Sequence, residues 1–214
     1  MLNLKSKVLG ATLSLPVVAA GLLGTAGSAQ AITFTSNSVE FYLQEFKDAG
    51  ATGITIGDKN FVYQESHGLE YSDEIRIEFS GPDYVLFYDL EYTPTSVADF
   101  SFDYIVNVTD PSYRITEVDN DSTVSTFAPS EELVTTFTGA STTVLTSTNG
   151  SVNLEPIAPS STVLVENLYT SNGGTIASFQ NSFHQTTPEP TTILGLGLLA
   201  SGMVVARRRK AAKA

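Results

Sequence analysis

The chain has 214 residues, of which 23 are acidic and 11 are basic, and it has no cysteine. Its formal net charge of −12 disfavours nucleic acid and anionic lipid surfaces as partners, because like charges repel. The lack of cysteine excludes disulfides, thiol catalysis and zinc sites that contain cysteine.

The first segment, residues 1–31, has the pattern of a secretory signal peptide. It starts with basic residues, continues with an apolar run and ends with small residues: Lys5, Lys7, Val8–Leu23, Ala29 and Ala31. This order is typical of an exported chain with an Ala-x-Ala cleavage site. We therefore predict cleavage after Ala31. A retained membrane span is the alternative, which Pro16 and the small-residue site disfavour.

Residues 32–187 are predicted to form one acidic extracytoplasmic domain. This body holds four basic and twenty-two acidic residues, so its net charge is −18. Its length suffices for a single hydrophobic core, and the sequence shows no second domain and no internal repeat.

Alternation of apolar and polar side chains predicts that the body is built from strands. Three segments show the alternation most clearly, namely Ile75–Phe79, Tyr84–Tyr92 and Phe100–Val108. Shorter strands are predicted at Thr52–Ile56, Phe61–Gln64, Tyr113–Val118, Thr123–Phe127, Leu133–Phe137, Thr142–Thr146, Thr162–Glu166 and Thr175–Phe183. The segment Ser38–Asp48 suits either a helix or a strand.

Turn-forming residues separate these strands. They occur at Gly57–Asn60, Gly81–Asp83, Asp110–Ser112, Asp119–Asp121, Asn149–Gly150 and Asn172–Gly174. Many short strands without long amphipathic helices predict an all-β fold, a single β-sandwich of either immunoglobulin-like or jelly-roll type.

No residue pattern in the body indicates catalysis. The only histidines, His67 and His184, have no metallopeptidase or nucleophile motif around them. Acidic neighbours such as Glu131 and Glu132 are expected by chance among so many carboxylates, although a carboxylate pair is what glycoside hydrolysis requires. We predict no catalytic, cofactor-binding or metal-binding residues, and no enzyme activity.

Two further segments suggest a function that their spacing does not support. Asp119–Ser122 resembles part of a calcium loop, but the glycine and the glutamate of such a loop are missing, which favours a hairpin turn. Thr135–Thr148 is rich in threonine, as an ice-binding face would be, but its irregular spacing favours a solvated sheet surface.

The C-terminal segment, residues 188–214, has three parts. Pro188, Glu189 and Pro190 precede an uncharged apolar run at 191–206, and the basic tail 207–214 begins with Arg207, Arg208, Arg209 and Lys210. As a helix, the apolar run is about 24 Å long, which makes it a thin transmembrane anchor. The basic cluster would remain cytoplasmic and leave the body outside.

These three parts together resemble the PEP-CTERM sorting signal of Gram-negative bacteria, which is often labelled as an ice-binding-protein C-terminal domain. The resemblance implies an exosortase-type membrane enzyme as a partner, which would process the chain near Pro188, Glu189 and Pro190. It also implies a location in the cell envelope, with anchoring by the C-terminal helix and release to the extracellular matrix after processing. It covers 188–210 and implies no activity for the body.

The leading hypothesis is therefore a non-enzymatic component of the bacterial surface or extracellular matrix. A carbohydrate-binding or carbohydrate-cleaving sandwich, with extracellular polysaccharide as its partner, is the first alternative. A simple membrane-anchored surface protein without processing is the second. Nucleic acid is not expected as a partner, and no cofactor is predicted.

Overall fold

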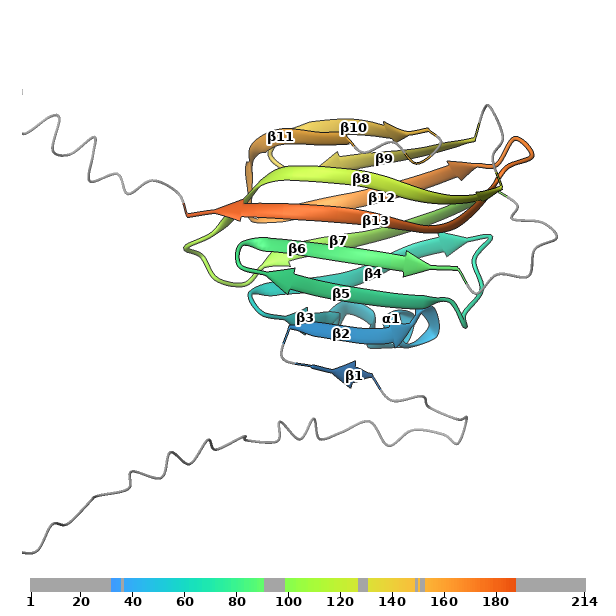
Figure 1. The fold of residues 1–214 in the computed structure, drawn as a ribbon. Helices are drawn as coiled ribbons and strands as arrows, with labels where there is room; N and C mark the ends of the chain where they lie inside the picture. The colour runs from blue at the N-terminus through green and yellow to red at the C-terminus, as the bar shows by residue number, and fades with distance from the viewer. Residues whose placement is uncertain are drawn as a thin grey trace, which may run out of the picture.

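Two antiparallel β-sheets pack face to face and enclose the core (Figure 1). In this computed structural model the described residues are 32–35, 37–90, 99–126, 131–148, 150 and 153–187. The predicted all-β sandwich is confirmed. From β6 onward the chain crosses repeatedly between the sheets, as in the jelly-roll form of the prediction.

The larger sheet, sheet A, has seven strands in the order β1-β2-β5-β6-β13-β8-β11. All of its neighbouring strands are antiparallel. The strands are β1 (Thr33–Phe34), β2 (Ser38–Tyr42), β5 (Glu74–Ser80), β6 (Asp83–Asp89), β13 (Thr175–Thr186), β8 (Arg114–Thr126) and β11 (Asn153–Ser160).

The smaller sheet, sheet B, has six strands in the order β10-β9-β12-β7-β4-β3. Its strands are β10 (Thr142–Ser147), β9 (Glu132–Thr138), β12 (Thr162–Thr170), β7 (Phe100–Val108), β4 (Lys59–His67) and β3 (Ile54–Ile56). Strand β7 confirms the clearest alternation in the sequence, because its even-numbered residues from Phe100 to Val106 are buried.

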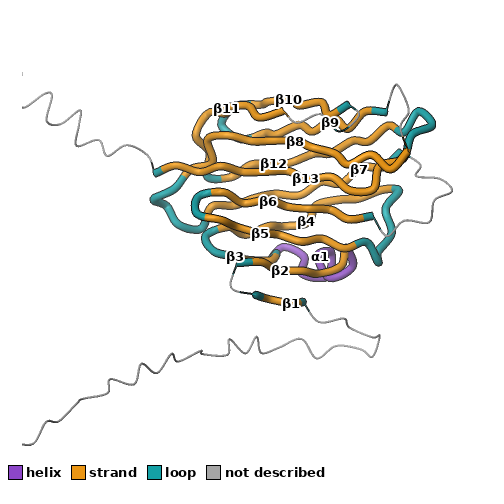
Figure 2. Tube along the Cα trace, in the orientation of Figure 1, coloured by secondary structure: helices purple, strands orange, loops and turns teal. Residues whose placement is uncertain are grey.

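The segment that suited either a helix or a strand contains both. Strand β2 ends at Tyr42, and the short helix α1 (Leu43–Ala49) follows, with a 3₁₀ turn η1 (Gly50–Thr52) after it (Figure 2). Glu45 accepts a hydrogen bond from the Tyr42 backbone N–H at 2.8 Å, which caps the helix. Phe46 is buried, and its ring lies 5.4 Å from that of Phe41.

Aromatic side chains from both sheets dominate the core. Tyr88 stacks on Phe179 within sheet A at 5.0 Å between ring centroids, and it meets Phe102 of sheet B edge to face at the same distance. The Tyr104 hydroxyl donates to Asn181 Oδ1 at 2.9 Å, so a buried polar contact also joins the sheets. Aromatic pairs such as those of Tyr88 with Phe179 and Phe102 stabilise the fold by about 0.5–1.5 kcal/mol each, beyond the effect of the area that they bury.

The turn predicted at Asp119–Asp121 is wrong, since β8 continues through it. Asn120 is fully buried, and its amide donates to the backbone oxygens of Leu133 and Leu145 on sheet B at 3.1 and 3.5 Å. The contact with the opposite sheet replaces the local hydrogen bonds that favour turns for Asn and Asp. The predicted strands at Tyr113–Val118 and Thr123–Phe127 are therefore one strand.

The other differences from the sequence prediction are one additional strand and a few strand ends. Strand β11 is not predicted, because Pro156 and Pro159 disfavour a strand in the sequence. Both prolines are tolerated in the structure because β11 lies at the edge of sheet A. Thr52 belongs to η1 and not to β3, while Lys59 and Asn60, predicted in a turn, begin β4. Tyr92, Phe127 and Asn149 lie outside the described residues.

The predicted signal peptide 1–31, the motif 188–190, the transmembrane segment 191–206 and the basic tail 207–214 also lie outside the described residues. Within the described part of the chain, no helix has the length and apolar character needed to cross a membrane.

Candidate functional site

The outward side chains of four adjacent strands in sheet A form a continuous surface, which we call the sheet A face. Its central row runs across β5, β6, β13 and β8 as Arg76, Phe87, Gln180 and Asp121. The rows on either side contain mainly carboxylates and hydroxyls: Glu78, Val85, Ser182 and Asp119 on one side, and Glu74, Asp89, Ser178 and Thr123 on the other.

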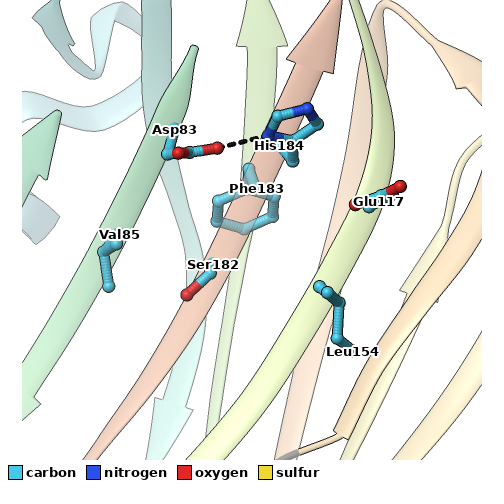
Figure 3. Close-up of a pocket in the computed structure, with 7 residues that line it drawn as sticks. All are labelled: Asp83, Val85, Glu117, Leu154, Ser182, Phe183 and His184. Carbon is cyan, nitrogen blue, oxygen red and sulfur yellow. Dashed lines mark hydrogen bonds and ion pairs between the residues drawn. The ribbon is translucent and has the colours of Figure 1, made fainter. Parts of the chain in front are cut away.

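A hollow of about 410 Å³ lies at one end of the sheet A face. It is lined by Asp83, Val85, Glu117, Leu154, Ser182, Phe183 and His184 (Figure 3). His184 Nδ1 contacts Asp83 Oδ1 on the neighbouring strand, and the two side chains point toward each other. The exposed Leu154 supplies an apolar wall, so the hollow combines apolar surface with hydrogen-bonding groups.

Two smaller hollows of about 130 and 90 Å³ adjoin each other further along this face. They share Phe87 and Ser178 as lining residues. The Arg76 guanidinium lies 4.7 Å from the centre of the Phe87 ring, and Arg76 Nε is 3.2 Å from Glu78 Oε1. The guanidinium is therefore held over the aromatic ring on one side of the hollows.

Acidic side chains outnumber basic ones on the sheet A face. Burial raises the pKa of Asp121 above its ordinary value, and a hydrogen bond from the Ser122 backbone N–H at 2.8 Å opposes part of that rise. Asp121, Gln180 and Ser178 line the same hollow, so a carboxyl, an amide and a hydroxyl group surround it. This set both donates and accepts hydrogen bonds.

The outward surface of sheet B, which we call the sheet B face, has a different character. Glu65, Asp103 and Glu166 lie in register on β4, β7 and β12. Burial, and then the neighbouring charges of Glu166 and Glu65, raise the pKa of Asp103 to about 6. Leu168 and Val144 are exposed on the same face.

A buried lysine lies between the sheets. The Lys59 side chain has no exposed surface, its Nζ is 2.8 Å from Asp58 Oδ1, and it lies 4.5 Å from the centre of the Tyr84 ring. Burial lowers the pKa of Lys59 despite its pairing with Asp58. Burial and the hydrogen bond to Asp58 raise the pKa of Tyr84 to about 12. The ion pair is thus part of the interior.

The structure separates the two histidines, which lie on different faces. His67 is 72% exposed and contacts Glu65 on the sheet B face at 2.8 Å, whereas His184 lines the largest of the hollows described above. Glu131 is buried and accepts a hydrogen bond from the Tyr169 hydroxyl at 3.3 Å, and the adjacent Glu132 is exposed. These two carboxylates therefore do not form a pair.

The structure also shows where the two segments lie whose suggested functions the sequence disfavours, Asp119–Ser122 and Thr135–Thr148. Asp119 and Asp121 lie on the same face of β8 while Asn120 points into the core, so Asp119–Ser122 is not a calcium loop. Among the described residues, no group of three or more acidic or histidine side chains is placed to hold a metal ion. Thr135 is buried and donates to Asn167 at 2.8 Å, so the threonine-rich segment is partly interior.

The predicted cleavage residues Ala29 and Ala31 lie outside the described residues. The same holds for the sorting motif Pro188, Glu189 and Pro190, and for the basic cluster Arg207, Arg208, Arg209 and Lys210.

The sequence did not indicate the sheet A face. Its residues come from β5, β6, β8 and β13, and no motif connects them. One usable signal was present, because the predicted β6 alternation places Val85 and Phe87 on the polar side of that strand. Apolar residues on the solvent side of a strand can mark a binding surface.

No family model matches the chain, and no curated protein matches it. Among solved structures, the chain is similar to a family 11 carbohydrate-binding module from Clostridium thermocellum, determined in complex with a β-1,3-1,4-mixed-linked tetrasaccharide. The TM-score is 0.27 and the sequence identity is 9%, with 61% of this chain and 89% of that chain covered. A likeness this distant bears on neither ligand nor site.

Proposed function

We propose that this protein is a non-catalytic β-sandwich that binds an uncharged polysaccharide across its sheet A face. The observation that carries the proposal is the series of hollows along that one face, which combine apolar surface with carboxyl, amide, hydroxyl and imidazole groups. A glycan chain has many hydroxyl groups along its length, so an extended row of mixed donors and acceptors suits it better than a single deep cavity.

The central row supports this ligand class in detail. Phe87 provides an apolar ring for the C–H surface of a sugar, and Gln180 and Asp121 lie next to it in register. Phe87 and Gln180 are only half-buried, so a ligand can reach them. Polar groups held on strands orient a ligand better than groups on loops, because paired strands are rigid.

The charge of the surface selects among glycans. Glu117, Asp121 and Asp89 lie along the hollows, and the body has a net charge of −18. Uronate-containing or sulfated polysaccharides would be repelled by this surface. Uncharged polysaccharides avoid the repulsion, and the carboxylates can accept hydrogen bonds from their hydroxyl groups.

Affinity electrophoresis of the full chain against uncharged and uronate-containing polysaccharides tests the proposal. We expect retardation by at least one uncharged polysaccharide and none by the uronate polymers. Gln180→Arg should weaken that retardation at least about tenfold, because a long charged side chain obstructs the central row. Thr136→Arg, which places the same side chain on the sheet B face, is the control and should change it less than about twofold.

The proposal fails if no uncharged polysaccharide retards the chain, or if both arginine variants bind equally well. Release of new reducing ends from a bound polysaccharide would instead support the carbohydrate-cleaving alternative. The proposal includes the lack of catalysis, and the measurement of reducing ends tests that part directly.

We also propose that the C-terminal segment delivers this domain to the cell envelope, as the resemblance to PEP-CTERM signals implies. The support is the order of Pro188–Pro190, the apolar run 191–206 and the basic cluster that begins at Arg207. Mass spectrometry of the protein from its native host should find the mature chain without peptides from 207–214. Dominant recovery of those peptides would leave a simple membrane anchor.

A further inference from the structure

The buried side chain of Lys59 contacts the amide of Gln185 and the carboxylate of Asp58, the two groups that its amine would need to form a covalent link. Lys59 lies at the start of β4 in sheet B, and Gln185 lies near the end of β13 in sheet A. Lys59 Nζ donates hydrogen bonds to Gln185 Oε1 and, at 2.8 Å, to Asp58 Oδ1. The same Asp58 oxygen accepts from Gln185 Nε2 at 3.3 Å. An amine, an amide and a carboxylate are therefore in mutual contact.

We propose that Lys59 and Gln185 form an intramolecular isopeptide bond, with Asp58 as the proton carrier. The amine nitrogen is the nucleophile, the amide carbon of Gln185 is the electrophile, and the amide nitrogen is the leaving group. The inference does not depend on glycan binding, since these side chains lie inside the sandwich and not on the sheet A face.

The reaction balances without any oxidant or added group. Asp58 accepts a proton from the Lys59 ammonium, and the neutral amine attacks Gln185 Cδ and forms a new C–N bond. Asp58 then donates the proton to Gln185 Nε2, the Cδ–Nε2 bond breaks, and ammonia leaves. Ammonia takes up the second proton released from the lysine nitrogen, so the products are the amide and ammonium, and Asp58 is again a carboxylate.

The surroundings of Lys59 favour this reaction. Burial lowers the pKa of Lys59, which makes the neutral, nucleophilic amine easier to form than in water. The balance at Asp58 is different, because hydrogen bonds from Lys59 and Tyr84 lower its pKa overall although burial alone would raise it. Asp58 therefore acts through its position against both nitrogens and not through raised basicity. The Tyr84 hydroxyl donates to Asp58 Oδ1 at 2.6 Å and so holds the carboxylate between the two nitrogens.

Exclusion of water also matters, because water would compete with the amine for the amide carbon. Lys59 is fully buried, and Gln185 is 5% exposed. Fixed neighbours in a dry site replace a bimolecular encounter with a reaction between groups already in contact.

The bond would join residues 126 positions apart in a chain that has no cysteine. A cross-link over so long a loop restricts the unfolded chain strongly, as a disulfide of the same span would. Unlike a disulfide, an isopeptide bond does not respond to the redox state of its surroundings. The bond would tie the two sheets together immediately before the C-terminal segment.

Peptide mapping of the full chain tests the proposal. After digestion with trypsin and a glutamate-specific protease, we expect one branched peptide that contains Lys59 and Gln185, with a mass equal to the sum of the two unmodified peptides minus one ammonia. Trypsin should not cleave after Lys59. Separate recovery of unmodified Lys59 and Gln185 peptides would overturn the proposal.

Branched-peptide sequencing is needed because loss of ammonia has another source. An Asn-Gly pair such as Asn149–Gly150 can lose ammonia by closing a ring with its own backbone. A loss that maps to that pair, without a branched peptide, would also overturn the proposal. The wild-type result is decisive even if a variant of the cluster fails to fold.

Two variants test the role assigned to Asp58. Asp58→Asn keeps an oxygen acceptor for Lys59 and Tyr84 but cannot carry the proton, so the linked fraction should fall at least about tenfold. Asp110→Asn is the matched control, since Asp110 also favours the charged form of Lys59 but accepts its hydrogen bond from the Ser112 backbone. It should leave the linked fraction unchanged. Equal linkage in both variants would remove Asp58 from the reaction.

Discussion

The two outward faces of the sandwich are built from the same kind of antiparallel strand but carry different side chains. On the sheet A face, Arg76 and Phe87 lie beside Gln180 and Asp121, and hollows open between the strands. On the sheet B face, the corresponding central positions bring carboxylates together, with Asp103 between Glu65 and Glu166. Strand pairing thus supplies a surface on both sheets, whereas the cross-strand combination of side chains decides the chemistry of that surface.

The largest expected difference between the faces concerns ligand affinity. Phe87→Ala removes the aromatic surface that two hollows share, so we expect polysaccharide binding to weaken about tenfold or more, equivalent to about 1.4 kcal/mol. Leu168→Ala removes an exposed apolar side chain from the sheet B face and is the control. Dissociation constants from affinity electrophoresis measure both. Equal weakening by the two substitutions would end the functional distinction between the faces.

The next effect concerns stability and is specific to the sheet B face. Asp103 has a folded pKa of about 6 against an ordinary value of 3.8, so the folded state favours its protonated form. The stabilisation of the folded state by protonated Asp103 is fully present below pH 3.8, the ordinary pKa, and is lost as the pH rises through about 6, the folded pKa. Asp103→Asn should therefore raise the free energy of unfolding at neutral pH by about 1 kcal/mol, after allowance for solvent screening.

Urea unfolding of the wild type and of Asp103→Asn measures this difference. The stability advantage of Asp103→Asn should shrink at about pH 4, because Asp103 is already protonated in the folded wild type at that pH and its negative charge no longer destabilises the fold. A gain of the same size at both pH values would mean that repulsion among these carboxylates is not its source.

The smallest expected effect belongs to the ion pair on the sheet A face. Arg76 and Glu78 are 41% and 43% exposed, so Glu78→Gln should lower the free energy of unfolding by less than about 0.5 kcal/mol. Unfolding at low and high salt checks this value, because salt screens exposed charges and should remove the difference. A larger loss that persists in high salt would indicate that Glu78 supports the position of Arg76 over Phe87 by packing.

Prediction from sequence succeeded where local alternation and tertiary packing agree. Strand β7 is predicted because apolar residues at the even-numbered positions from Phe100 to Val106 alternate with polar ones, Ile105 excepted, and the structure buries those even-numbered residues. Prediction failed at Asp119–Asp121, where local preference favours a turn and a distant contact favours a strand. The buried amide of Asn120 finds its acceptors on β9 and β10 of the other sheet, and no local pattern contains that information.

The candidate site was predicted even less well, for a related reason. Gln180 and Phe87 are 93 positions apart in the chain, and they become neighbours only through the register of β13 with β6. The contact of His184 with Asp83 depends on the same register. A binding face on a sheet is assembled across strands, whereas sequence periodicity describes one strand at a time.

The strand-rich character of the body, its acidity, its freedom from disulfides and the order of the segments at both ends follow from the amino-acid sequence alone, because composition, residue order and local periodicity contain these properties. Tertiary packing determines which strands are neighbours, which face is hollowed and why Lys59 lies inside. Those outcomes depend on contacts between distant residues, such as Lys59 with Gln185 and Phe87 with Gln180. Packing of the two sheets selects those contacts together, and no single segment encodes them.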